Sequence, residues 1–177
     1  MYKILKNLEG NRELTSIYTD VNNCDRFAVG YIMDVTETQA LILNIGLHGE
    51  FDGYTVIKVD DIYRIETQSK YLKKINGLSD VNIDTVFEIK TTDDLLIDVL
   101  NKAIERKSIV VVGVGDIDNS IMGYVEKVED NKVYIEQVNE YGESDGSSVI
   151  LYNEIVRVVI EDVECCEIDR LYHYRDK

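Results

Sequence analysis

Two short acidic segments contain the side chains whose types and spacing come closest to a chemical site. Residues 49–53 and 142–146 share the pattern Gly-Glu-x-Asp-Gly, and their carboxylates belong to Glu50, Asp52, Glu143 and Asp145. Paired carboxylates could ligate a hard cation such as Ca²⁺, but Ca²⁺ takes about six to eight oxygen ligands and one loop supplies only a few. Asp-Gly is also typical of turns, because both residues tolerate a positive φ. We therefore expect turns here, and no bound metal.

Two arginines occupy matching places in two similar stretches of the chain. Arg64 and Arg157 each follow an acidic side chain by three residues, Asp61 in the first stretch and Glu154 in the second. An ion pair within the fold is one interpretation. The other is that both arginines grip a carboxylate or phosphate of a partner, since a guanidinium holds such a group through two parallel hydrogen bonds. Both arginines are therefore candidate binding residues.

Tyrosines are the second kind of candidate binding residue. The chain has 12 of them, and tyrosine is among the residues that anchor protein–protein interfaces. Tyr31 and Tyr124 each follow a glycine inside a long predicted strand. We take these two as the candidate interface anchors.

The histidines and cysteines form no pattern for catalysis or metal binding. His48 and His173 lie at unrelated positions without ligand-spaced companions, and Cys24, Cys165 and Cys166 are an odd count with no Cys-x-x-Cys pair. The acidic neighbours of the two adjacent cysteines are expected to raise their thiol pKa and lower their reactivity. A nucleophile elbow and a phosphate-binding lysine motif are also missing. We expect no enzyme and no cofactor.

An internal repeat organises the chain. Residues 30–65 align without a gap on residues 123–158, an offset of 93, and 12 of the 36 pairs are identical. Unrelated windows would share roughly two identities at typical residue frequencies. Upstream, Ser16-Ile17 matches Ser108-Ile109, which would put one extra residue in the first loop of the second copy.

Each copy reads as five strands behind a helix. Short runs rich in Ile, Val, Tyr and Thr between turn signals predict strands at 16–21, 27–35, 40–45, 54–59 and 62–66, and at 108–114, 121–128, 132–138, 148–152 and 155–160. An apolar stripe behind a capping signal predicts a helix over 92–106, and residues 2–8 predict a shorter helix that Gly10 stops. The segments at 71–78 and 168–172 contain spaced apolar residues and are expected to form short docking helices.

We therefore predict a mainly β (α+β) protein of two small domains. The polar stretch 76–84 is the expected linker, so the predicted domains are 1–80 and 81–177, each a helix and a five-stranded barrel. The unit resembles the Sm-like fold and other Src-homology-3-like small barrels. The residues that carry the resemblance are Gly30-Tyr31-Ile32 and Gly123-Tyr124-Val125, with the closing segments 61–65 and 154–158.

Charge favours a protein partner over a nucleic acid. The chain has 34 acidic and 19 basic side chains, a formal net charge of −15, which repels phosphate backbones and attracts basic proteins. The leading hypothesis is a non-enzymatic interaction or regulatory module, in a more specific form an acidic inhibitor of a basic partner. The exposed strand edges of small open barrels also make a homodimer plausible.

Two other functions stay open. The resemblance implies RNA binding by an Sm-like ring, but the Asn, Asp and Arg-Gly pattern of true Sm-like proteins is almost absent, and only Asn44 matches. An enzyme that uses the paired carboxylates ranks last, because no general base accompanies them. The sequence contains no membrane-spanning run and no signal peptide at its start, and we expect a cytoplasmic protein that does not bind membranes.

Overall fold

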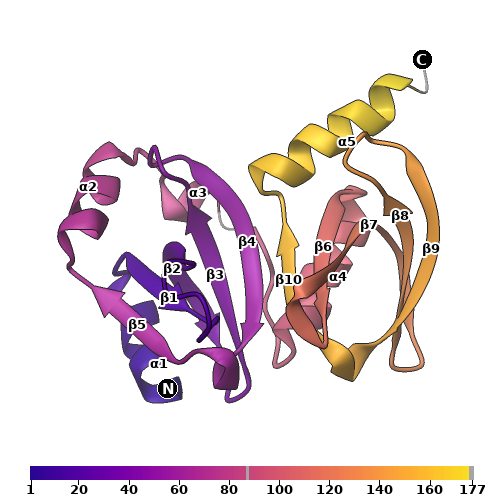
Figure 1. Ribbon diagram of the computed structural model, residues 1–177. Coiled ribbons are helices and arrows are strands. Elements are labelled where there is room, and N and C mark those ends of the chain that lie inside the picture. The colour runs from indigo at the N-terminus through magenta and orange to yellow at the C-terminus, as the bar shows by residue number, and fades with distance from the viewer. Residues whose placement is uncertain (87, 176–177) are drawn as a thin grey trace. The chain divides into compact units, whose positions relative to one another are not determined.

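The computed structural model describes residues 1–86 and 88–175. The chain divides into two compact units, Met1–Leu95 and Leu96–Lys177, which are described one at a time below. The predicted domain boundary stood at residue 80, so the division lies later in the chain than the predicted linker. The protein is mainly β, as predicted, with helices at the ends of each group of strands (Figure 1).

Unit 1 is an open antiparallel sheet with helices before and after it. Its strands lie in the order β5-β1-β2-β3-β4. The elements are α1 (Tyr2–Asn11), β1 (Thr15–Tyr18), β2 (Ala28–Val35), β3 (Gln39–Ile45), β4 (Phe51–Lys58), the 3₁₀ turn η1 (Val59–Asp61), β5 (Arg64–Thr67), α2 (Lys70–Leu78) and α3 (Ile83–Val86). All five strands were predicted, with their ends shifted by a few residues.

Unit 2 repeats this architecture. Its strands lie in the corresponding order β10-β6-β7-β8-β9. The elements are α4 (Leu95–Arg106), β6 (Ile109–Val114), β7 (Asp116–Glu129), β8 (Lys132–Val138), β9 (Ser144–Leu151), the 3₁₀ turn η2 (Tyr152–Glu154), β10 (Ile155–Ile160) and α5 (Val163–Arg175). In each unit the fourth and fifth strands stand at opposite ends of the order, and among the described residues they do not pair with each other. A closed barrel is therefore not found.

One contact explains why the second strand of each unit contains a glycine. A Cβ built on Gly30 would collide with the carbonyl oxygen of Leu43 on the neighbouring strand, and a Cβ built on Gly123 would collide with that of Glu136. The two contacts are related by the repeat offset of 93. Only a residue without a side chain allows this approach of two backbones.

The Asp-Gly pairs do not form the predicted turns. The turns before β4 and β9 are closed instead by hydrogen bonds from the Gly49 N–H to Gly46 O and from the Gly142 N–H to Asn139 O. Gly53 and Gly146, with φ of 75° and 86°, lie inside β4 and β9. The pairing register shifts at each of these places. The Asp-Gly pairs thus form β-bulges, where an extra residue with positive φ bends the strand.

The upstream alignment of the two copies was wrong. Thr15 pairs with Gly30 in unit 1, and Val110 pairs with Gly123 in unit 2. Thr15 therefore corresponds to Val110, and not to Lys107 as the match of Ser16 with Ser108 would require. The first unit, not the second, has the longer loop between its first two strands.

The helices cover the sheets and fill the cores. In unit 1, α1 packs on β2 and buries Leu5 and Leu8 against the sheet. Gly10 does not stop this helix, which continues to Asn11 and ends where Arg12 takes the left-handed conformation at φ 48°. In unit 2, α5 packs on β6 and buries Cys165 and Ile168. Within the described part of the chain no helix is long and apolar enough to cross a membrane.

The predicted docking helices are confirmed as α2 and α5, and both begin with the same kind of cap. The Ser69 hydroxyl accepts a hydrogen bond from the Leu72 N–H at 3.1 Å, and the Asp162 carboxylate accepts one from the Cys165 N–H at 2.8 Å. A side chain in this place satisfies one of the free N–H groups of a first helical turn. The offset of 93 therefore extends beyond the aligned strands into the helix that follows the fifth strand of each unit.

Candidate functional site

Within each unit, the carboxylates of the acidic segment belong to a turn and to a strand bulge. Glu50 Oε2 accepts a hydrogen bond from the His48 N–H at 2.9 Å, and Glu143 Oε2 accepts one from Asn139 Nδ2 at 3.3 Å. Each glutamate therefore closes its own turn, while Asp52 and Asp145 stand in the bulges of β4 and β9. In the part of the chain that the structure describes, no group of three or more His, Cys, Asp or Glu side chains could hold a metal ion.

The two candidate arginines have different surroundings. The Arg64 guanidinium forms an ion pair with Glu66 and lies over the ring of Tyr18, 4.4 Å from its centre. The acidic partner is thus Glu66 and not the predicted Asp61. Arg157 lies on β10 opposite Gly113, which offers no aromatic surface. Arg64 is held within its unit by an ion pair and a cation–π contact.

Tyr31 and Tyr124 attach the helix that follows the fifth strand of their unit to the sheet. The Tyr31 hydroxyl donates to Asn76 Oδ1 on α2 at 3.2 Å, and the Tyr124 hydroxyl donates to Asp169 Oδ1 on α5 at 2.7 Å. Burial raises the pKa of Tyr31. Burial, reinforced by the hydrogen bond to Asp169, raises the pKa of Tyr124. Both hydroxyls are therefore neutral donors inside the fold.

A cluster of aromatic and charged side chains surrounds Tyr124. The Tyr172 ring packs edge-on against it with centres 5.1 Å apart, and the Tyr172 hydroxyl donates to Glu136 Oε1 at 3.2 Å. His173 Nε2 lies 3.7 Å from Asp169 Oδ1. The sequence did not reveal this cluster, because its members come from β7, β8 and α5.

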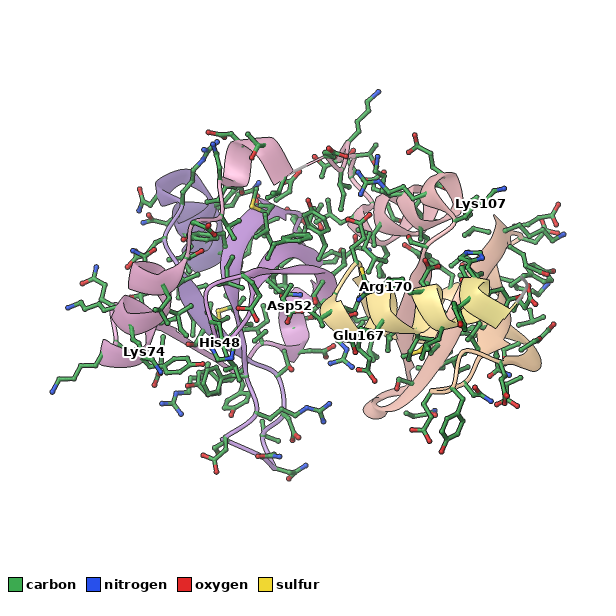
Figure 2. The ribbon with its side chains drawn as sticks, turned by 90° about the horizontal axis from the view of Figure 1, so that it is seen from above. His48, Asp52, Lys74, Lys107, Glu167 and Arg170 are labelled. Atoms are coloured by element: carbon green, nitrogen blue, oxygen red, sulfur yellow. The ribbon has the colours of Figure 1, made fainter. Side chains whose placement is uncertain are left out.

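A pocket opens beside the contact between tyrosine and helix in each unit. The first helix pocket, about 460 Å³, lies between the end of α1 and α2, and its lining includes Asn11, Arg12, Glu13, Gln68, Leu72 and Asn76. The second helix pocket, about 220 Å³, lies between the end of α4 and α5, and its lining includes Lys107, Ser108, Tyr124, Glu136, Tyr172 and His173. Figure 2 shows Lys107 after α4, and Glu167 and Arg170 on α5.

The same backbone feature places a polar side chain in both pockets. Arg12 and Lys107 both take the left-handed conformation after the first helix of their unit, with φ of 48° and 52°. Each is followed by a side chain with a buried oxygen that has no hydrogen-bond partner among the described residues, Oε1 of Glu13 and Oγ of Ser108. Neither residue was singled out from the sequence, because the incorrect upstream alignment hid their correspondence.

The remaining candidates stand apart from the pockets or at their rims. Cys165 is buried, whereas Cys24 and Cys166 are exposed. Burial, and secondarily Asp162, raises the pKa of the Cys165 thiol, and burial with nearby carboxylates raises that of Cys166. The predicted direction of the thiol pKa agrees, although burial is its first cause, and the lower reactivity stays a prediction. Lys73 and Lys74 are exposed on α2, and Figure 2 shows Lys74 extending outward.

No protein-family model matches the chain, and no significant match is found among curated proteins or solved structures. The function therefore has to be argued from the chain's own residues. The described residues include hydrogen-bonding groups, aromatic rings and exposed carboxylates, which are side chains that can bind a partner.

Proposed function

We propose that the chain is a non-enzymatic protein-interaction module that recognises a basic partner protein. The observation that carries the proposal is the excess of 34 acidic over 19 basic side chains, a net charge of −15. A field of this sign steers basic proteins toward the surface and repels nucleic acids. A regulatory protein that blocks the basic, nucleic-acid-binding surface of its partner is the specific form that this charge favours.

The engagement of Arg64 also supports a protein partner. Its guanidinium is already paired with Glu66 and lies over Tyr18, so gripping a phosphate would require breaking contacts that the fold already makes. Phosphate binding by basic side chains supplies essentially all of the sequence-independent affinity for nucleic acids. Arg64, committed to these contacts, therefore contributes little of that affinity.

Sm-like RNA binding is the second candidate. The observation that favours it is that each unit has a helix followed by five antiparallel strands, the pattern on which the resemblance to the Sm-like fold rests. The exposed lysines Lys70, Lys73 and Lys74 of α2 provide a local basic surface within the acidic whole. The overall charge weighs against this candidate.

One experiment separates the two functions. The immobilised full-length chain is incubated with native host lysate, washed at low or at high salt, and its bound proteins and nucleic acids are identified. Basic proteins that bind at low salt and leave at high salt support the interaction module. RNA that stays bound and is lost from the Arg64→Ala, Arg157→Ala double variant would refute it in favour of the Sm-like function.

A further inference from the structure

The strand β9 is an exposed edge of unit 2. It is the last strand in the order β10-β6-β7-β8-β9, and β8 is its neighbour within the unit. Figure 1 shows β9 as the outer strand of this unit. Six of its eight residues are exposed, and only Ser148 and Ile150 are not. An edge of this kind presents backbone N–H and C=O groups that another chain can pair with.

The pairing register shows which backbone groups face outward. The Tyr152 N–H donates to Asn131 O at 3.0 Å, just beyond the pair formed by Leu151 and Lys132. Hydrogen-bonded and non-hydrogen-bonded pairs alternate along an antiparallel ladder. Leu151, Val149 and Ser147 therefore turn their N–H and C=O groups away from β8. This row of groups is long enough to hold a strand of about five to seven residues.

The strand has two features that protect an edge, the bulge at Gly146 and the charge of Asp145, but both lie near its start. Its sequence, Ser-Asp-Gly-Ser-Ser-Val-Ile-Leu, contains no lysine and no proline, the residues that discourage pairing with other chains. The apolar side chains of Val149 and Leu151 are 57% and 50% exposed. By contrast, β5 at the edge of unit 1 has four residues and a charged pair, Arg64 and Glu66.

Carboxylates gather around the beginning and the end of β9. Glu140, Glu143 and Asp145 are exposed at its start, and Glu154 is exposed after its end. One cation, Lys132, lies on β8 opposite Leu151. An added strand would thus meet two exposed apolar side chains in its middle and negative charge at both ends.

We propose that β9 binds its partner by strand addition, and that the occupant is an extended basic segment of the partner protein. The segment would place apolar side chains beside Val149 and Leu151 and lysines or arginines near Glu143 and Asp145. This inference rests on the proposed function and names the surface that performs it. Backbone hydrogen bonds supply affinity in this mode, and alternate side chains supply specificity.

The test uses the full-length chain and two synthetic peptides of equal charge. One alternates lysine with valine and can form a strand. The other alternates lysine with proline, so it lacks the backbone donors that pairing requires. Calorimetric titration at low salt is expected to give at least about tenfold tighter binding of the lysine–valine peptide, equivalent to about 1.4 kcal/mol.

Two variants at one position separate backbone pairing from side-chain contact. Val149→Pro removes an N–H that faces the free edge, whereas Val149→Thr removes apolar surface and keeps the N–H. The proline variant is expected to lose the preference for the lysine–valine peptide, and the threonine variant to keep most of it. A far-UV circular dichroism spectrum and a melting curve check folding. The double variant Val149→Lys, Leu151→Lys, which keeps every backbone donor and repels a basic segment, serves if the proline variant does not fold.

Charge is tested with two variants of equal net charge. Glu143→Gln with Asp145→Asn neutralises the end of β9, and Asp25→Asn with Glu37→Gln neutralises two exposed carboxylates of unit 1. The first is expected to weaken the lysine–valine peptide at least about fivefold and the second less than twofold.

The possible failures are distinguishable. If both peptides bind equally, and the variants in β9 weaken binding no more than the unit 1 variant does, the acidic module stands but β9 is not its binding strand. If neither peptide binds at low salt, the proposed function fails as well. If the chain dimerises in gel filtration and Val149→Pro abolishes the dimer without changing peptide binding, β9 pairs with a second copy, and a basic partner segment is the wrong occupant.

Discussion

A matched pair of glycine substitutions tests whether the close strand approach is built into both units. Gly123→Ala adds a Cβ that would collide with Glu136 O and lie 2.8 Å from both Glu136 C and Ile135 Cγ2. Gly30→Ala adds one that would collide with Leu43 O and lie 2.7 Å from Ile42 Cγ2. Because the carbonyl belongs to the neighbouring backbone, a rotamer change cannot relieve the collision. The two strands of each pair have to separate.

The expected cost follows from this geometry. Overpacking in a well-packed site costs about 1–3 kcal/mol, and weakening one or two ladder hydrogen bonds adds about 1 kcal/mol each. We expect each substitution to lower the free energy of unfolding of its own unit by about 3 kcal/mol. For a domain of this size the melting temperature would fall by roughly 12–24 °C. Differential scanning calorimetry and urea denaturation measure the change.

Glycines without neighbours provide the controls. A Cβ added at Gly10 in α1 or at Gly77 in α2 meets no atom within 4 Å, and alanine is favoured over glycine in a helix by up to about 1 kcal/mol. Gly10→Ala and Gly77→Ala are expected to keep or slightly raise the stability of unit 1. The reasoning would be refuted if Gly30→Ala and Gly123→Ala cost less than about 0.5 kcal/mol, or if all four variants behaved alike.

Three further predictions concern the helix contacts and the thiols. The folded state raises the pKa of Tyr124, so the neutral hydroxyl stabilises the fold fully below pH ~10, and this stabilisation is lost as the pH rises further. In urea denaturation, the free energy of unfolding should fall more steeply at alkaline pH for the native chain than for Tyr124→Phe. Equal slopes would contradict this. With Ellman's reagent, exposed Cys24 should react first, Cys166 more slowly and buried Cys165 only on unfolding; immediate reaction of all three would rule out the described burial. Ser69→Ala removes the cap of α2 and should cost about 1 kcal/mol in urea denaturation; an unchanged free energy of unfolding would exclude a capping role.

The strands were predictable because their signals are local. Runs of β-branched and aromatic residues between turn signals located all ten strands, and the helical stripe at 95–104 located α4. Gly10 misled because a glycine is a common helix terminator but not a required one. The backbone turns at Arg12 instead, a residue type that takes positive φ only at some energetic cost.

The contacts at the candidate sites were harder to predict, since they join distant elements. Nothing in the sequence alone connects Tyr31 with Asn76 or Tyr124 with Asp169, although each pair shares the repeat offset. An alignment extended past the fifth strand would have suggested both contacts, because it places α2 on α5 without a gap. The bulges at Gly53 and Gly146 were misread for a related reason, since Asp-Gly is equally suited to a turn and to a bulge.

The differences between the two units show where their roles could diverge. In unit 2, Arg106 and Glu161 form an ion pair between the end of α4 and the residue after β10. In unit 1 the matching places hold Asn11 and Gln68, which line the first helix pocket instead. A side-chain pair that ties two segments together restricts the space between them, which agrees with the smaller second helix pocket. Unit 1 thus retains the roomier pocket, while unit 2 has β9 as a long exposed edge strand, so we expect the two copies of this architecture to present different binding surfaces.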